Sequence, residues 1–283
     1  MSAPADRTVH LPAGPTLRVR EWPGSGRGLL LLHGFLGGVE SWGSLPGRLR
    51  GVRAVAVDLP GHGGSREVAP GDCTVPRVVE TLAALQERLF DRPPMWLGYS
   101  MGARIALAAA AEGVPGAALL LESGSPGLAE PQSRAARREV DEARARRIEA
   151  IGIEAFVDEW LRLPIFDGLR ACAPEVVLAA RAVRAAQDPE RMAACLREGG
   201  TGTQPSYWED LARIRRPVRL VVGVKDPKFM AVAREMSARL PDAVVREVPG
   251  SGHTVHLEAP DAWLGWVRGA LADVEPSDLR SSQ

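Results

Sequence analysis

The chain has 283 residues and carries 35 basic and 35 acidic side chains, so its formal net charge is zero. Hydrophobic residues make up 45% of the sequence and charged residues 25%, as in an ordinary soluble globular protein. Proteins that bind nucleic acid or a membrane surface usually show a basic excess, so the charge balance favours neither kind of partner. The length fits one large domain, or a domain with a sizeable insertion.

The three cysteines, Cys73, Cys172 and Cys195, show no metal-ligand or redox spacing, and we expect a reducing compartment. Residues 1–10 have no apolar core of the kind found in signal peptides. Every apolar run is far shorter than the ~20 residues that span a bilayer. We therefore predict a cytoplasmic protein without metal or cofactor, and leave its oligomeric state open.

Hydrophobic periodicity predicts strands that alternate with helices at both ends of the chain. The expected strands are residues 16–22, 28–32, 53–58, 95–99, 117–122, 218–224 and 244–248. The expected helices are residues 41–50, 75–90, 101–111, 230–240 and 260–272. Most of the strands are near-continuous apolar runs, the pattern of a parallel sheet covered on both faces.

The segment 127–205 differs, because it contains no strand pattern. It is rich in Ala, Arg and Glu, and its apolar residues, such as Phe156 and Trp160, follow helical spacing. Six arginines fall between residues 134 and 147. We expect an α/β core formed by residues 1–126 and 206–283, with a helical cap inserted at 127–205.

The pentapeptide Gly98-Tyr99-Ser100-Met101-Gly102 matches G-x-S-x-G, between an expected strand and an expected helix. The flanking glycines permit a sharp turn that exposes the serine hydroxyl. The helix that follows directs its first N–H groups toward any developing anion. Ser100 is therefore the candidate nucleophile or base.

A serine hydroxyl needs a base, and that base needs an acid to orient it. Asp226 follows the strand at 218–224, at the end of a strand where open α/β sheets place their ligands. His253 lies in a glycine-rich loop after the last strand. The order Ser, Asp, His fits this strand-turn-helix arrangement. We expect structural roles for His256 and His62.

Two backbone N–H groups are candidates for an oxyanion hole. His33-Gly34-Phe35 follows the strand at 28–32, and the turn would direct the Phe35 N–H into the site together with that of Met101. One such donor typically contributes ~10²–10³ in rate. Arg104 stands four residues after Ser100 and shares its helix face, although an arginine there can also form a structural ion pair. Tyr99 could hydrogen-bond a substrate carboxylate.

Eight blocks of the sequence resemble a known family. They are residues 32–37 (LHGFLG), 58–65 (DLPGHGGS), 97–104 (LGYSMGAR), 124–128 (GSPGL), 163–166 (LPIF), 200–208 (GTGTQPSYW), 225–229 (KDPKF) and 252–256 (GHTVH). Together they resemble the synthases that make 2-succinyl-6-hydroxy-2,4-cyclohexadiene-1-carboxylate in menaquinone biosynthesis. The resemblance implies the α/β-hydrolase fold, with a mostly parallel central sheet flanked by helices and an inserted helical cap.

The resemblance also implies a lyase that expels pyruvate from an enolpyruvyl cyclohexene carboxylate, with Ser100, Asp226 and His253 acting as a base. Such a substrate carries three carboxylates, for which the resemblance implies the side chains of Arg104, Arg137 and Arg184, with Tyr99 beside them. It also implies that Trp160 packs over the substrate, although an aromatic residue at helical spacing also fits the core. The spacing leaves Arg134 or Arg181 open as alternatives to Arg137 and Arg184. The family pattern often has Leu-Gly-Gly-Arg after the serine, where this chain has Met-Gly-Ala-Arg.

Two other functions fit the same residues. A serine hydrolase, either a carboxylesterase or a carbon–carbon bond hydrolase, would share the catalytic triad, and the fold alone does not separate it from the lyase. A small-molecule sensor would keep the fold and bind its ligand without turnover. Arg104 and the arginines of the cap favour an anionic substrate over a neutral ester.

Overall fold

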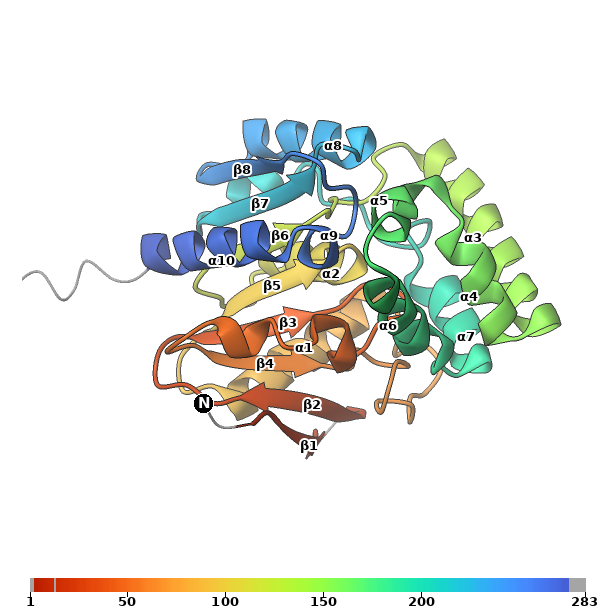
Figure 1. Cartoon of the computed structure of the whole chain (residues 1–283), viewed down its shortest axis with the longest axis horizontal. Helices are drawn as coiled ribbons and strands as arrows, with labels where there is room; N and C mark the ends of the chain where they lie inside the picture. The colour runs from red at the N-terminus through yellow and green to blue at the C-terminus, as the bar shows by residue number, and fades with distance from the viewer. Residues whose placement is uncertain (1–2, 13, 275–283) are drawn as a thin grey trace, which may run out of the picture.

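An eight-stranded sheet runs through the structure, a computed structural model that describes residues 3–12 and 14–274 (Figure 1). The strand order is β1-β2-β4-β3-β5-β6-β7-β8. The pairs β1–β2 and β2–β4 are antiparallel, and all later pairs are parallel. The strands are Ala5–His10 (β1), Thr16–Trp22 (β2), Gly28–Leu32 (β3), Arg53–Val57 (β4), Met95–Tyr99 (β5), Leu119–Glu122 (β6), Val218–Gly223 (β7) and Ala243–Val248 (β8).

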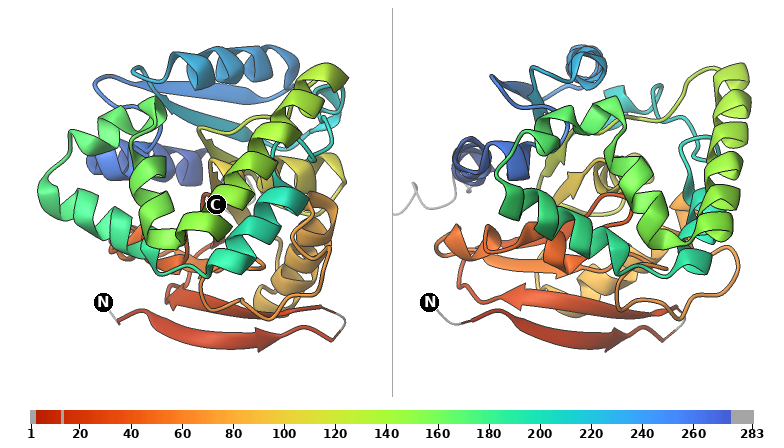
Figure 2. Two further views of the ribbon diagram at one scale, coloured as in Figure 1. Left: turned by 90° about the vertical axis from the view of Figure 1, so that its right-hand side faces the viewer. Right: turned by 45° about the vertical axis from the view of Figure 1, so that its right-hand side comes forward.

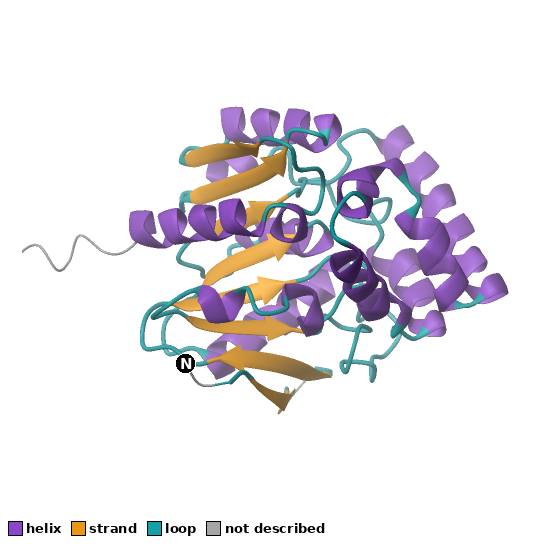
Figure 3. Ribbon diagram, viewed as in Figure 1, coloured by secondary structure: helices purple, strands orange, loops and turns teal. Residues whose placement is uncertain are grey.

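Helices cover both faces of this sheet (Figures 1 and 3). Those outside the segment between β6 and β7 are Val75–Leu89 (α1), Met101–Ala111 (α2), Pro227–Arg239 (α8), Val255–Glu258 (α9) and Pro260–Val274 (α10). Three short 3₁₀ helices accompany them: Val39–Trp42 (η1), Pro46–Arg48 (η2) and Leu211–Arg213 (η4). The alternation of strands and helices predicted from the sequence is confirmed.

Two sequence expectations were wrong. Residues 41–50 do not form one helix, because Gly43 takes a φ of 50° and Pro46 follows it, so the segment divides into η1 and η2. Strand β1 was not expected. It is an exposed edge strand in which only Val9 is buried, so it carries no apolar alternation to detect.

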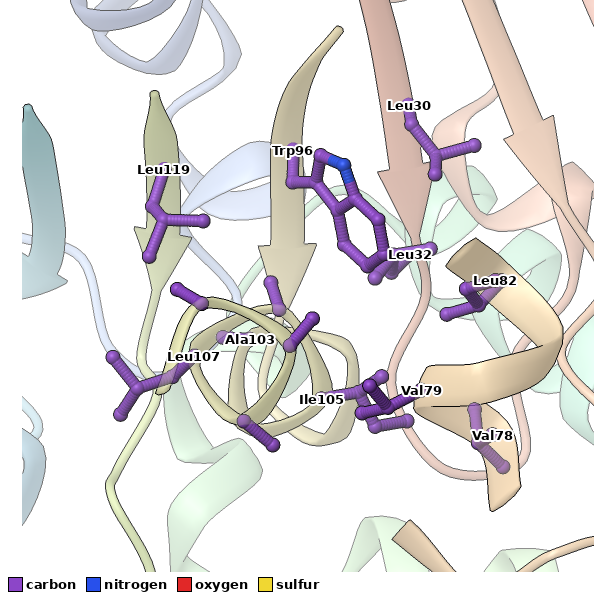
Figure 4. Packing of buried hydrophobic residues seen from close by; sticks show 14 of the residues in the cluster. Leu30, Leu32, Val78, Val79, Leu82, Trp96, Ala103, Ile105, Leu107 and Leu119 are labelled. Carbon is purple, nitrogen blue, oxygen red and sulfur yellow. The ribbon is translucent and has the colours of Figure 1, made fainter. Parts of the chain in front are cut away.

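The two faces of the sheet bury separate apolar clusters. Alternate residues of β3 divide between them: Leu30 and Leu32 pack toward α1, α2 and α8, while Leu29 and Leu31 face η1 and α10. Figure 4 shows the first cluster, with Leu32 and Trp96 against the α1 side chains Val79 and Leu82. The parallel strands are therefore buried on both faces. Their carboxyl ends lie at one edge of the sheet, where the functional loops begin.

The insertion is the run of helices between β6 and β7, residues 131–199. It comprises Pro131–Ile151 (α3), Ile153–Leu161 (α4), Pro164–Phe166 (η3), Asp167–Arg170 (α5), Pro174–Ala185 (α6) and Pro189–Gly199 (α7). Figures 1 and 2 show these helices beyond the carboxyl ends of the parallel strands. They lie on the side of the molecule to which Ser100 and the other strand-end residues belong.

A third apolar cluster joins the insertion to the sheet domain. It combines Phe156, Val157 and Met192 of the insertion with Leu36, which follows β3. Cys195 of α7 and Cys73, which precedes α1, lie side by side with their Cα atoms 5.2 Å apart. The sequence spacing did not indicate this pair, because 122 residues separate the two cysteines. No helix in residues 3–12 and 14–274 is long and apolar enough to cross a membrane.

Candidate active site

Ser100 lies at a strained turn between β5 and α2. Its φ is 51°, a value that non-glycine residues rarely adopt. Its backbone N–H donates to the carbonyl of Glu122 at 2.8 Å, which ties the turn to the end of β6. A Cβ on Gly98 would collide with the backbone of Gly102, and a Cβ on Gly102 with the carbonyl of Leu32. Both glycines of the motif are therefore required by close packing of the turn.

The side chains of Ser100, His253 and Asp226 form a hydrogen-bonded chain. His253 Nε2 lies 3.0 Å from Ser100 Oγ, and His253 Nδ1 lies 2.7 Å from Asp226 Oδ2. As a carboxylate, Asp226 can only accept a hydrogen bond, so the facing Nδ1 of His253 carries the proton. The other ring nitrogen, Nε2, is then free to accept a proton from the serine. This is the geometry of a serine with its general base and orienting acid.

Each member of this chain is held by a second contact. Asp226 also caps α8, where its Oδ1 accepts the N–H of Phe229 at 3.2 Å. The carbonyl of His253 accepts the hydroxyl of Ser123 at 2.9 Å. The Phe229 ring lies 4.6 Å from the imidazole. The imidazole therefore has little freedom to turn away from Ser100.

The two candidate oxyanion donors flank this chain. Phe35 follows β3 in a turn that His33 braces, since the His33 ring accepts the N–H of Leu59 at 3.0 Å. Met101 is the first residue of α2. Within the described part of the chain, neither the Phe35 nor the Met101 N–H finds an acceptor. Burial lowers the pKa of His33 to about 4, so this imidazole stays neutral and can accept.

Tyr99 is buried directly beneath the site. Its hydroxyl lies 3.1 Å from Thr254 Oγ1, and its ring lies 5.6 Å from that of His253. Burial raises the pKa of the phenol well above its usual range, while the nearby charge of Arg184 acts against that rise. Tyr99 is therefore a protonated donor next to a guanidinium group.

Arg104 extends from α2 toward the segment that follows the insertion. Its guanidinium donates to Gln204 Oε1 and, at 3.5 Å, to the carbonyl of Gly199. Burial and, to a lesser extent, the neighbouring charge of Arg137 lower its pKa to about 10. Arg137 is paired with Asp141, at 2.8 Å. These two arginines are thus close enough to repel each other.

Arg184 of α6 is buried, and burial lowers its pKa. It donates to the carbonyl of Ala180 at 2.7 Å, and its Cζ lies 5.7 Å from the Phe166 ring. Its Nε has no partner among the described residues. Trp160 of α4 packs edge-on to Phe35, with ring centroids 5.6 Å apart. Both residues of the insertion therefore contact or approach the strand-end residues.

The two alternative arginines are engaged elsewhere. Arg134 donates to the carbonyls of Leu128 and Ala129, at the start of α3. Arg181 forms an ion pair with Asp158 at 2.6 Å. Both side chains are partly exposed, at 35% and 40%. Arg181 thus has a carboxylate partner, whereas Arg134 bonds two carbonyls at the start of α3.

A cavity of about 400 Å³ lies next to Tyr99, a volume within the range of small-molecule sites. It lies between η1, α6 and α9 and is lined by Phe35, Tyr99 and Arg184 among others. Ser100, Asp226, His253 and Arg104 are not among its lining residues, so the cavity is connected to the triad only through Tyr99 and Phe35, which line it. Within residues 3–12 and 14–274, no group of three or more His, Cys, Asp or Glu side chains could hold a metal ion.

Sequence reasoning missed two buried polar groups beside the site. Glu122, at the end of β6, accepts the Nδ1 and backbone N–H of His256 and the indole N–H of Trp263, at 2.8, 3.0 and 2.8 Å. A charged residue at the end of an apolar strand was the sequence signal that could have identified Glu122. Gln204 belongs to a motif that the sequence analysis quoted only for its resemblance.

Comparison with known proteins agrees with this geometry. Residues 29–265 match the model of the alpha/beta hydrolase family. A putative 2-succinyl-6-hydroxy-2,4-cyclohexadiene-1-carboxylate synthase from Bacillus subtilis (strain 168) is 35% identical over 85% of this chain and 88% of its own length. The corresponding synthase from Salmonella paratyphi C (strain RKS4594) is 32% identical over 82% of this chain and 88% of its own.

Among solved structures, MenH from S. aureus superposes with a TM-score of 0.88 at 31% identity, and the match covers 91% of this chain and 99% of that one. The match includes most of both the sheet and the insertion. This chain therefore belongs to the alpha/beta hydrolase family and, within it, to the family of 2-succinyl-6-hydroxy-2,4-cyclohexadiene-1-carboxylate synthases.

Proposed function

We propose that this protein is a lyase that eliminates pyruvate from 2-succinyl-5-enolpyruvyl-6-hydroxy-3-cyclohexene-1-carboxylate. The product is 2-succinyl-6-hydroxy-2,4-cyclohexadiene-1-carboxylate, named in its relatives from Bacillus subtilis and Salmonella. The observation that carries the proposal is a Ser-His-Asp chain close to guanidinium groups that lack a carboxylate partner. A base and a polyanion site are what this reaction requires.

In the proposed reaction the triad removes a proton rather than accepting an acyl group. Ser100, with its proton transferred to His253 Nε2, takes the proton from the ring carbon next to the side-chain ketone. Asp226 stabilises the imidazolium that forms. The electron pair released at the ring carbon generates an enolate.

The enolate oxygen would lie between the N–H groups of Phe35 and Met101, which have no other acceptor among the described residues. Collapse of the enolate forms the first new ring double bond and shifts the existing one. The bond between the ring and the enolpyruvyl oxygen breaks in the same step, and its electron pair leaves with that oxygen. The leaving group takes up a proton and becomes pyruvate, so the ring gains one double bond and loses one substituent.

The three substrate carboxylates need cationic partners, and we assign Arg104, Arg137 and Arg184 to them, with Tyr99 as a neutral donor. Arg104 and Arg184 are chosen because they lack a carboxylate partner, and Arg137 because it lies close to Arg104 and shares Asp141 with Arg144. Each charge-assisted hydrogen bond contributes about 1.5–3 kcal/mol. We assign Trp160 to the apolar wall over the ring, next to Phe35.

The same proposal treats residues 127–205 as a cap over a core of residues 1–126 and 206–283, acting on a small molecule in the cytoplasm. A serine hydrolase remains the alternative, because an esterase would use the same hydrogen-bonded chain. The unpaired guanidinium groups favour the lyase, since a neutral ester offers them nothing to bind.

The test follows pyruvate release from the enolpyruvyl substrate, with the rate of spontaneous decomposition subtracted. Wild type should release pyruvate rapidly, and Ser100→Ala should reduce the catalysed rate to near background. If wild type shows no release above background but hydrolyses esters in a Ser100-dependent way, the lyase is ruled out and the hydrolase stands.

A further inference from the structure

Arg104 has only neutral hydrogen-bond partners. Its guanidinium donates to the side-chain oxygen of Gln204 and to the carbonyl of Gly199. Within the described residues, no carboxylate oxygen lies within 4.0 Å of it. A partly buried cation usually pairs with an acid, but Arg104 has no direct carboxylate partner and Asp141 acts on it only at longer range.

The nearest acid is already taken. Asp141, which is only 2% exposed, accepts Arg137 Nε at 2.8 Å and lies 3.6 Å from Arg144 Nη1. It also accepts the N–H of Gly202, at 3.4 Å. One carboxylate thus serves two guanidinium groups, and Arg104 adds a third positive charge to the cluster.

Gln204 is held in place by the loop that contains it. Its backbone N–H donates to the carbonyl of Gly200 at 3.1 Å, and its side chain is only 1% exposed. The loop packs tightly on α3, because a Cβ on Gly202 would collide with the backbone N of Arg138. The amide oxygen of Gln204 is therefore a fixed acceptor, positioned before any substrate arrives.

We infer that Gln204 is a positioning and specificity-determining residue, which orients Arg104 without neutralising it. This inference rests on the proposed function and extends it to a residue outside the triad and the arginine set. A glutamate has nearly the same shape and would bond Arg104 more strongly, but its charge would cancel the attraction of Arg104 for a substrate carboxylate. The neutral amide keeps the geometry and leaves the charge for the substrate.

Stability alone would not select glutamine at this position. Gln204 Nε2 is buried and has no acceptor among the described residues, an arrangement that costs stability. Glutamate would remove that donor and add an ion pair with Arg104. The glutamine therefore lowers stability at this position, as residues of functional sites often do.

The experiment compares Gln204→Glu, Gln204→Met and a matched control, Gln86→Glu. Gln86 is also buried, but it accepts the indole N–H of Trp96 and donates to the carbonyl of Pro115, remote from Arg104. Three readouts are needed: the melting temperature, KM and kcat for pyruvate release, and the Kd for 2-succinylbenzoate, an aromatic analogue of the product.

For Gln204→Glu we expect KM and Kd to rise about tenfold or more, with kcat changed less and the melting temperature equal to or above that of wild type. Gln204→Met keeps the charge of Arg104 but loses its acceptor, so binding should weaken by a smaller factor. Gln86→Glu should melt at a lower temperature and bind the probe like wild type. A merely structural role for Gln204 would instead lower stability and binding together.

The outcomes separate the two proposals. Wild type that releases pyruvate, with KM unaffected by Gln204→Glu, overturns the role of Gln204 and leaves the lyase standing. If wild type releases no pyruvate but binds 2-succinylbenzoate, and Gln204→Glu weakens that binding, the lyase is overturned and the role of Gln204 is kept. A Gln204→Glu protein that melts well below wild type overturns the inference, and wild type that neither binds the probe nor turns over overturns both.

Discussion

On the sheet side of the candidate site, the buried acids have hydrogen-bond partners: Asp226 with His253, and Glu122 with His256 and Trp263. On the side formed by the insertion and the loop after it, Arg104 and Arg184 donate only to neutral groups. The first network has its hydrogen-bond partners without a ligand, whereas the guanidinium groups of the second have no carboxylate partner. A complete network sets the orientation of reactive groups, and an incomplete one supplies binding energy for a matching ligand.

The largest expected effect comes from disturbing the complete network without removing a side chain. Asp226→Asn presents an amide to His253 and favours the wrong tautomer, so kcat should fall about 10³–10⁴-fold. Its Oδ1 can still accept the N–H of Phe229, so α8 keeps its cap and the melting temperature should hold. A loss of activity that tracks a loss of folded protein would argue against the tautomer role.

An intermediate effect is expected where charge is unpaired. Arg104→Ala should raise KM about 10–100-fold, because one charge-assisted contact to a substrate carboxylate is lost. Stability should change little, since the substitution removes a cation with no acidic partner. Steady-state kinetics and denaturant unfolding measure the two quantities.

Arg181→Ala is the matched control, because Arg181 is an arginine of the insertion that does have a carboxylate partner, Asp158. Its KM should equal that of wild type, and its loss of stability should stay below about 1 kcal/mol. Equal KM changes in the two variants would remove the distinction between paired and unpaired arginines.

A further effect, on stability and not on activity, concerns the neutral imidazoles on the sheet side. Burial lowers the pKa of His33 to about 4 and that of His62 to about 3, and the charge of His33 adds to the lowering at His62. Between these values and 6.5 the unfolded chain binds more protons than the folded chain. The free energy of unfolding should therefore fall as the pH drops from 7 to 5, by about 2 kcal/mol for each imidazole.

Urea unfolding at pH 7 and pH 5 measures this dependence. His62→Asn should reduce the fall by the share of one imidazole, because the variant has nothing to protonate there. His10→Asn, which changes an exposed imidazole, is the control for the removal of a histidine. An unchanged fall in His62→Asn would show that His62 is not held neutral by burial.

The parallel strands and the positions of Ser100, Asp226 and His253 were predictable from the sequence, because apolar runs and the residues that end them are local signals. Strand β1 was not, since its exposed residues pair along an edge without an apolar face. The break in 41–50 was missed because the effect of Gly43 depends on a positive φ that the sequence does not display.

The arginine set was harder to predict, because two of its members, Arg104 and Arg184, are defined by the absence of a carboxylate partner among the described residues. The sequence alone does not distinguish a ligand-binding arginine such as Arg137 or Arg184 from an alternative such as Arg134 or Arg181. Only the fold shows that Asp158 occupies Arg181 and that Nε of the buried Arg184 lacks a partner among the described residues. Gln204 escaped for the same reason: its contact with Arg104 spans 100 residues of sequence.

The third apolar cluster has a consequence for how new specificities could arise in this family. Its members include Leu36, which has a φ of 63° and directly follows Phe35, the proposed oxyanion donor. The insertion thus rests on the same turn that would stabilise the enolate. Grafting the insertion of a relative onto this sheet should therefore change turnover as well as substrate choice, and the two properties should evolve together unless residues 33–38 are exchanged with it.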